Sequence, residues 1–202
     1  MGLLFYFTQI RRKLVMTEKT HAVGSLVFAT GAFLIMDQCK LLDPQIAKIA
    51  QYGIITPYAL WGAQIPDFDQ DNPNRIVTNP INRLIMDLFK VLNAKHRGLL
   101  SHILPVILSG ITFLLMCLPF FTFYVQGTSL DVLRLMVLGL FLGLLSHLIL
   151  DMCTKDGIYF GHYRIALVPK MDVFKTGTAY EKTFRKILYA VCCILCILCI
   201  IL

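Results

Sequence analysis

Charged residues are scarce in this sequence. Only 15% of its 202 residues are Asp, Glu, Lys or Arg, whereas 57% are hydrophobic. The mean hydropathy of +0.70 is higher than soluble domains show. Apolar runs long enough to cross a hydrocarbon core predict an integral membrane protein, in a single membrane-embedded domain over residues 1–202. The net charge of +7 then bears on orientation and on anionic lipid headgroups, so we expect no direct nucleic-acid partner.

A disulfide framework is also missing. The seven cysteines show no such spacing, and four of them fall in the apolar tail VCCILCILCIIL. We interpret this tail as a membrane span in which Cys serves as a small apolar residue; acylation or metal binding is the alternative. The N-terminal stretch MGLLFYFTQIRRK places its charges after a short apolar run, unlike a signal peptide, and we expect it to lie at the membrane interface.

Five segments are apolar enough to be drawn as transmembrane helices, over residues 22–38, 49–65, 100–124, 130–150 and 186–202. In the 66–99 connection, apolar residues such as Leu84 and Leu88 recur at helical spacing and predict an amphipathic helix on the membrane surface. A helix packed on other protein segments is the alternative. The expected fold class is all-α: a polytopic membrane protein with about five spans and one interfacial helix.

Lys and Arg are distributed unevenly among the connections. Sixteen lie in the N-terminal tail and in the 66–99 and 151–186 connections, against two, Lys40 and Lys48, on the opposite side. This bias follows the positive-inside rule. It predicts a multi-pass protein of the inner membrane whose N-terminus and two long connections are cytoplasmic.

Residues able to bind metals gather at the predicted cytoplasmic ends of the spans: His21 starts the first, Asp67 and Asp69 end the second, His96 and His102 start the third, and His147 and Asp151 end the fourth. Ionisable groups within spans are costly and mark functional sites. His147 and Asp151 share one helical face, which continues back to Gly143 and Gly139 as a surface that a neighbouring helix can approach closely. For His147 alone, an interhelical hydrogen bond is the alternative.

The stretch HRGLLSH places His96 and His102 six residues apart, or about 120° apart on a continuous helix. Both reach one site only if the helix begins after Gly98, which leaves His96 on a loop. Arg97 would then point its guanidinium at a phosphate; a positive-inside anchor is the alternative. His162 has no comparable neighbours, and we expect it on the surface.

Mixed histidine and carboxylate ligands suit zinc, manganese or iron. The candidate metal ligands are His21, Asp67, Asp69, His102, His147 and Asp151. This set exceeds the need of one four-coordinate ion, so it predicts either two divalent ions or one ion with a general base, zinc or manganese being most expected. His21 and His96 are ligands or proton carriers.

Four short motifs occur in order: TH before the first span, then PDFD, HRGLLSH and HLILDMCTKDG. Over about residues 19–185 the chain resembles the YdjM family of inner-membrane proteins, which is described as metal-dependent hydrolases and as LexA-binding. In KTGTAYEK, Glu181 matches an acidic position of that family. The family often reads P-D-x-D-H, whereas here Gln70 follows Asp69, so this chain lacks that histidine or uses another group.

The resemblance and the polar cluster together predict a membrane-bound, metal-dependent hydrolase of a phosphoester or ester at the cytoplasmic interface, with a lipid or lipid-linked phosphate as substrate. His96, Arg97 and Glu181 are the expected catalytic residues. His96 binds metal or carries a proton, Arg97 holds substrate charge, and Glu181 orients water or a histidine. The arrangement is distantly similar to zinc-dependent phospholipases C, which favours phosphodiester chemistry.

Three other functions compete with this hypothesis. A non-catalytic, metal-stabilised scaffold would recruit a cytoplasmic protein partner. A divalent-ion transporter is less expected, because the polar residues gather at one membrane face rather than at the midplane. A nucleophilic enzyme would use Ser101, Ser146 or Cys153, although small residues beside helical histidines are common packing choices.

Overall fold

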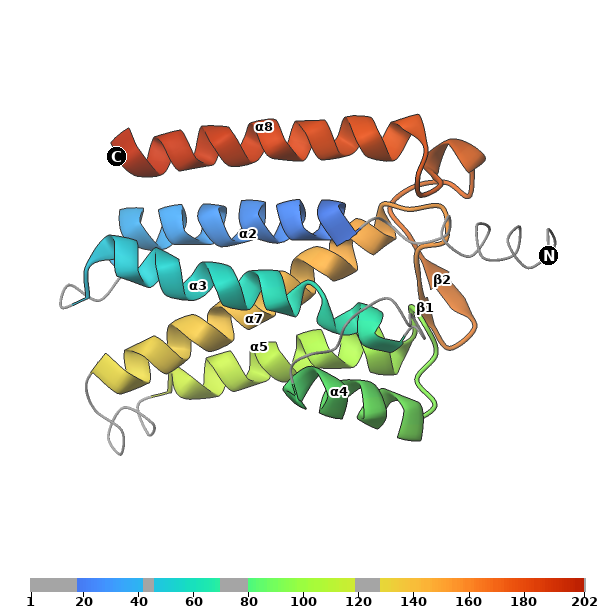
Figure 1. Cartoon of the computed structure of the whole chain (residues 1–202), viewed down its shortest axis with the longest axis horizontal. Coiled ribbons are helices and arrows are strands. Elements are labelled where there is room, and N and C mark those ends of the chain that lie inside the picture. The colour runs from blue at the N-terminus through green and yellow to red at the C-terminus, as the bar shows by residue number, and fades with distance from the viewer. Residues whose placement is uncertain (1–17, 42–45, 70–79, 119–127, 202) are drawn as a thin grey trace.

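The computed structural model describes residues 18–41, 46–69, 80–118 and 128–201, and these residues are mostly helical (Figure 1). Helices α2 (Glu18–Gln38), α3 (Lys48–Gly62), α5 (Leu104–Met116), α7 (Thr128–Met152) and α8 (Ala179–Ile201) form a bundle. The starts of α2, α5 and α8 and the ends of α3 and α7 lie at the same end of this bundle (Figure 1). The expected interfacial N-terminal segment and Gln70 lie outside the described residues.

Four helical stretches in the described ranges are long and apolar enough to cross a membrane: Glu18–Gln38, Leu99–Met116, Ser129–Met152 and Ala179–Ile201. They match four of the five expected spans. The remaining span, expected over 49–65, forms α3, which has 15 residues and is therefore about 22 Å long. That length is short of a hydrocarbon core of about 30 Å. The helix gives way to a 3-10 turn, η1 (Ile65–Asp69), so the expected count of five spans is not confirmed.

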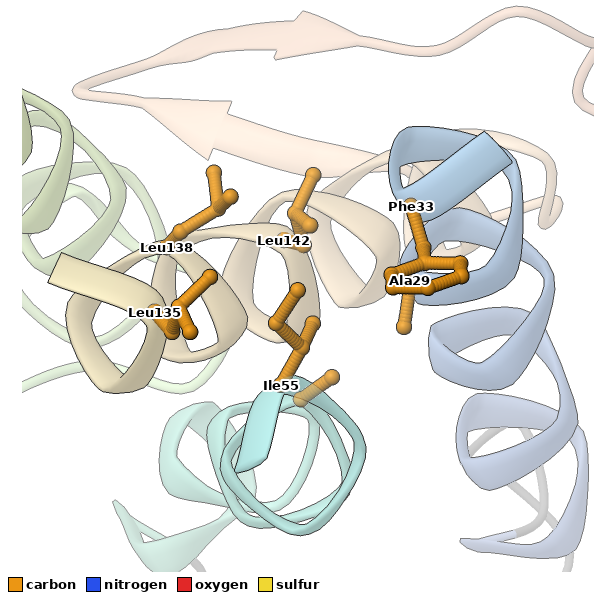
Figure 2. Close-up of a cluster of buried hydrophobic side chains, with 7 residues drawn as sticks. Ala29, Phe33, Ile55, Leu135, Leu138 and Leu142 are labelled. Carbon is orange, nitrogen blue, oxygen red and sulfur yellow. The ribbon is translucent and has the colours of Figure 1, made fainter. Parts of the chain in front are cut away.

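The apolar core lies where α2, α3 and α7 meet. Its buried side chains are drawn in Figure 2, and they are Ala29, Phe33, Ile55, Ala59, Leu135, Leu138 and Leu142. Burial of such side chains contributes about 1.5–3 kcal/mol for each large residue in water, and within a membrane the same contacts act through close packing. The core therefore holds the three helices whose ends carry most of the predicted ligands.

The glycines of α7 allow its backbone to touch that of α3, as the sequence predicted. A Cβ on Gly143 would lie 2.0 Å from the carbonyl oxygen of Ala59, and one on Gly139 would lie 2.4 Å from that of Ile55. From the other side, a Cβ on Gly62 would lie 2.5 Å from the carbonyl oxygen of Leu140. No side chain fits in these positions, so the glycines fix how α7 is placed along α3.

Helix α4 (Pro80–Val91) is the amphipathic segment expected in the 66–99 connection. One face packs on protein, because Phe89 is buried and Ile85 contacts the same apolar cluster. A neighbouring stripe, made of Leu84, Leu88 and Val91, is exposed. Figure 1 shows α4 lying beside the first half of α5. The packed-helix alternative therefore describes one face of α4, and the stripe of Leu84, Leu88 and Val91 is exposed.

A β-hairpin corrects the all-α expectation in the 151–186 connection. Strands β1 (Ile158–Phe160) and β2 (Tyr163–Ile165) pair antiparallel, with Ile158 opposite Ile165. The Tyr159 N–H donates to the carbonyl oxygen of Arg97 at 2.7 Å, which docks the hairpin on the His96–Gly98 loop. Strands of three residues are too short to show a readable alternation of apolar and polar side chains, so the sequence pattern missed them. A 3-10 turn, η3 (Asp172–Phe174), precedes α8.

Replacing Gly143 with alanine tests the helix contact. Because the added Cβ would overlap a backbone carbonyl, we expect Gly143→Ala to destabilise the protein by about 1–3 kcal/mol. The matched control is Gly53→Ala in α3, where nothing lies within 4 Å and the change should be neutral or slightly stabilising. Thermal unfolding of both variants in detergent measures the difference. Equal melting temperatures would contradict the close approach.

Candidate metal centre

The predicted ligands come from four elements and meet at one end of the bundle. His21 lies in the first turn of α2, and Asp67 and Asp69 lie in η1. His102 lies in η2 (Leu99–Ile103), a π-helical turn that leads into α5. His147 and Asp151 lie in the last turns of α7. The side chains of His21, Asp67, His102, His147 and Asp151 are all between 0% and 2% exposed.

His21 and His147 stack face to face at the centre. Their ring centroids are 3.8 Å apart and their planes differ by 8°. His147 Nδ1 lies 2.6 Å from the carbonyl oxygen of Ala63. Because a carbonyl only accepts, Nδ1 carries the proton and Nε2 presents a lone pair. That Nε2, and both ring nitrogens of His21, are buried with no hydrogen-bond partner among the described residues.

Two carboxylates face these nitrogens. His147 Nε2 is 3.8 Å from Asp67 Oδ1 and 3.6 Å from Asp151 Oδ2. His21 Nε2 is 3.6 Å from Asp151 Oδ1. These separations exceed a hydrogen bond but suit two ligands of one ion, because metal–ligand bonds of about 2.0–2.2 Å place neighbouring donors several ångströms apart. Each unmet buried polar group costs about 1–3 kcal/mol, which a bound cation would offset.

The surroundings of His102 assign the same role to its Nε2. Ser101 Oγ donates to the carbonyl oxygen of Lys95 at 2.9 Å and lies 2.9 Å from His102 Nδ1. Since the one hydroxyl proton of Ser101 is used, His102 Nδ1 must be the donor to Ser101. His102 Nε2 then directs a lone pair at Asp151 Oδ2, 3.1 Å away. Two acceptors at this distance need a cation or a proton between them.

Ser101, His102 and Asp151 follow the order of a nucleophile, a base and a carboxylate, but their hydrogen bonds run the other way. Ser101 is fully buried and its proton points away from the histidine. Ser146 donates back to the Gly143 carbonyl of its own helix. Burial raises the pKa of the Cys153 thiol, which lowers its thiolate content. The geometry therefore does not favour a nucleophilic enzyme.

Arg97 is buried beside the centre rather than directed at open solvent. Its Nη2 donates to Asp151 Oδ1 at 3.0 Å, and its Nη1 donates to Thr154 Oγ1 at 2.9 Å. The helix begins after Gly98, as the sequence predicted, and Arg97 has a left-handed φ of 58°. In this geometry Arg97 orients the Asp151 carboxylate, and the expected contact of Arg97 with substrate stays a prediction.

His96 forms the exposed edge of the centre. Its side chain is 33% exposed, in contrast to the other ligand candidates, and its Nδ1 lies 2.9 Å from Asp69 Oδ1. Its ring centroid is 5.5 Å from that of His102. Asp69, expected as a metal ligand, thus accepts the hydrogen bond of a histidine. His96 is therefore the partly exposed member of the centre, and Asp69 orients its ring.

Glu181 lies outside the groups of residues that can hold an ion. It is buried in the first turn of α8, where Oε1 accepts from Thr20 Oγ1 at 2.7 Å and Oε2 accepts from the Gly177 N–H at 2.6 Å. Thr20 precedes His21 in α2. Glu181 therefore joins α8 to the residue before a ligand, through a contact that spacing along the sequence does not reveal.

Three groups of donors in the described ranges can hold a metal ion: His21 with Asp67 and His147, Asp67 with His96 and His102, and His102 with His147 and Asp151. In each group the ligand atoms lie within 4.8 Å of one another. Nitrogen and carboxylate donors together match the preference of zinc, manganese and iron. The residues present therefore fit a divalent transition metal.

Sequence reasoning missed the groups that orient these ligands. The backbone carbonyls of Ala63 and Lys95 cannot be identified from a sequence motif. Ser101 was considered only as a nucleophile. His162 lies in the hairpin turn and is exposed, as predicted. A separate cavity of about 820 Å³, lined in part by Met36, Phe113 and Arg134, lies at the other end of the bundle and includes none of the candidate ligands.

The family model described as YdjM inner membrane protein matches residues 16–202 of the chain. The match covers every candidate ligand and extends through α8, beyond the 19–185 range of the sequence resemblance. No curated protein and no solved structure matches the chain.

Removing the Ser101 hydroxyl tests the assignment of His102. Ser101→Ala takes away the acceptor that fixes the His102 ring, so we expect metal affinity to fall about 10–100-fold. Ser146→Ala is the matched control, because this equally buried hydroxyl bonds only within α7 and should leave affinity unchanged. Competition with a metal-sensitive dye measures both affinities. An unchanged affinity in Ser101→Ala would remove His102 from the ligands.

Proposed function

The chain belongs to the YdjM family of inner membrane proteins, and from this premise we propose that it is a membrane-bound, metal-dependent hydrolase of a phosphoester or ester. The observation that carries the proposal is the set of buried imidazole nitrogens on His21 and His147 that have no hydrogen-bond partner among the described residues and face the carboxylates of Asp67 and Asp151. Zinc or manganese is the proposed ion, because both accept mixed nitrogen and oxygen ligands.

A divalent ion in this position supplies Lewis acidity, which lowers the pKa of water and polarises a phosphoryl or ester oxygen. The chain contributes the rest. Arg97 donates to one oxygen of Asp151 and so keeps its carboxylate in place, with the other oxygen facing His102 Nε2. His96, oriented by Asp69, is the side chain that meets solvent and therefore the one that can reach a substrate.

The proposed substrate is a lipid or lipid-linked phosphate at the cytoplasmic face of the membrane. The uneven distribution of Lys and Arg supports this orientation, with the N-terminus and the centre on the cytoplasmic side. The exposed stripe of Leu84, Leu88 and Val91 on α4 supports contact with the lipid interface near the centre. Arg83 and Lys90 on the same helix suit anionic headgroups.

A second function is favoured by the burial of the centre. Structural zinc sites are closed by protein ligands, and five of the candidate ligands here are at most 2% exposed. In this alternative the metal stabilises the bundle, and the exposed surfaces recruit a cytoplasmic protein partner. The two functions share the metal and differ in whether the His96 edge admits a substrate.

Metal analysis and activity assays on the purified full chain test the proposal. We expect zinc or manganese at near-stoichiometric amounts, and a loss of at least several-fold in His147→Ala combined with Asp151→Ala. His162→Ala, in the exposed hairpin turn, is the matched control and should keep its metal. Elemental analysis measures the content.

Activity is then measured on chromogenic phosphodiesters and esters and on phospholipid vesicles, with and without a chelator. Hydrolysis that the chelator abolishes, and that the His147→Ala, Asp151→Ala variant lacks, is the expected result. A folded protein that binds metal but hydrolyses none of these substrates would favour the scaffold. A protein that binds no metal would contradict both functions.

The proposed orientation has its own test. In a background without the native cysteines, we expect a cysteine at His162 to react with a membrane-impermeant thiol reagent only after the inner membrane is opened, and one at Lys40 to react in intact spheroplasts. The excess of Lys and Arg on the predicted cytoplasmic side is the physical reason. Reaction of both from the same side would contradict the orientation.

A further inference from the structure

Two of the three donor groups share only Asp67 and divide the four histidines into pairs, while the third group joins His102 and His147 through Asp151. His21 and His147 lie together with Asp67, whereas His96 and His102 lie together with the same Asp67. The two groups share no other residue. We propose that the centre is dinuclear, with two divalent cations bridged by Asp67, an inference that rests on the proposed metal-dependent function and specifies its site.

The orientation of the rings supports this division. Each imidazole nitrogen can bind one ion, and three of the four rings have their Nδ1 engaged by a neighbouring group: His96 by Asp69, His102 by Ser101 and His147 by Ala63. Such contacts are typical of metal-binding histidines, because they fix the tautomer that presents Nε2. Asp69 thus acts through His96 as a positioning residue.

The number of donors also exceeds what one ion accepts. Four histidines and two carboxylates offer more ligands than a tetrahedral ion holds, and zinc is almost always four-coordinate. If only one ion were bound, by the His96 and His102 group, the buried ring nitrogens of His21 and Nε2 of His147 would remain without hydrogen-bond partners among the described residues. A second ion resolves this, because each histidine pair then has its own cation and both cations use a carboxylate oxygen of Asp67.

Asp151 lies between the two groups. Its Oδ2 is 3.1 Å from His102 Nε2 and 3.6 Å from His147 Nε2, so one oxygen faces a histidine of each pair. Arg97 binds its Oδ1, which leaves Oδ2 directed at the centre. Asp151 is therefore a second carboxylate within reach of both cations.

Two cations narrow the substrate class. Paired metal ions a few ångströms apart are characteristic of phosphatases and nucleases, where both the attacking and the leaving oxygen of a phosphoryl group need stabilisation. A dinuclear centre therefore favours a phosphoester over a carboxylic ester as substrate of the proposed hydrolase.

Metal stoichiometry of the purified full chain tests the inference. After saturation with manganese and removal of free metal, we expect two ions per chain, and an electron paramagnetic resonance spectrum of an exchange-coupled pair. His96→Ala, at the exposed edge, should retain one ion and lose the coupled spectrum. His21→Ala should also retain one, and Asp67→Asn should bind both ions at least 10-fold more weakly. His162→Ala is the control and should bind two.

The outcomes separate this inference from the proposed function. One ion in the wild-type chain and one in His96→Ala would overturn the dinuclear centre and leave a mononuclear metalloprotein. Two ions in His96→Ala would also overturn it, since His96 would then be no ligand. No bound ion in the wild type would overturn the proposed function itself. Melting temperatures show that each variant is folded, and His96→Ala suffices if the buried variants are not.

Discussion

The contact between α3 and α7 is the constraint on which the centre depends. The two helices run in the same direction, and their contacts keep one register. Every fourth residue of α3 meets every fourth residue of α7, in the pairs Ile55 with Gly139, Ala59 with Gly143, and Ala63 with His147. In the third pair the position on α7 is His147 instead of a glycine, and its Nδ1 donates to the Ala63 carbonyl oxygen. The next step of four residues reaches Asp67 and Asp151, the carboxylates on either side of His147.

The same arrangement concentrates negative charge at an unfavourable place. Asp151 closes α7 and Asp67 follows α3, so both carboxylates lie where the helix dipole is negative. Arg97 compensates part of this charge through Asp151, and it lies in a left-handed backbone conformation that its side-chain bonds help to maintain. A cation would satisfy the remaining charge and the imidazole nitrogens of His21 and His147 together, because these nitrogens have no hydrogen-bond partner among the described residues.

The sequence predicted where the ligands would meet, and it did so from two independent patterns. The Lys and Arg distribution oriented the spans, and the positions of His21, His102 and His147 then fell at one end. It could not predict the partners of each ligand. Hydrophobic periodicity places a residue on a helix face. The pairing of Arg97 with Asp151, or of Asp69 with His96, depends instead on the backbone conformation of single residues in the loops. The sequence also did not predict how short α3 is or that a hairpin follows α7. Neither feature produces a long periodic pattern of apolar residues.

The exposed edge at His96 lies next in the chain to α4, whose Leu84, Leu88 and Val91 are exposed. Only four residues lie between His96 and Val91, the last residue of α4, and the turn that they form includes a left-handed backbone at Asn93. Because this connecting segment is short, the position of α4 restricts the position of His96. The hairpin restrains the other side of the same loop through the Arg97 carbonyl. A closed structural site has no need for a ligand held on a loop between two anchored elements, whereas a catalytic site requires an edge that is both accessible and firmly positioned. This mechanical support of His96 therefore weighs toward catalysis over a purely structural metal.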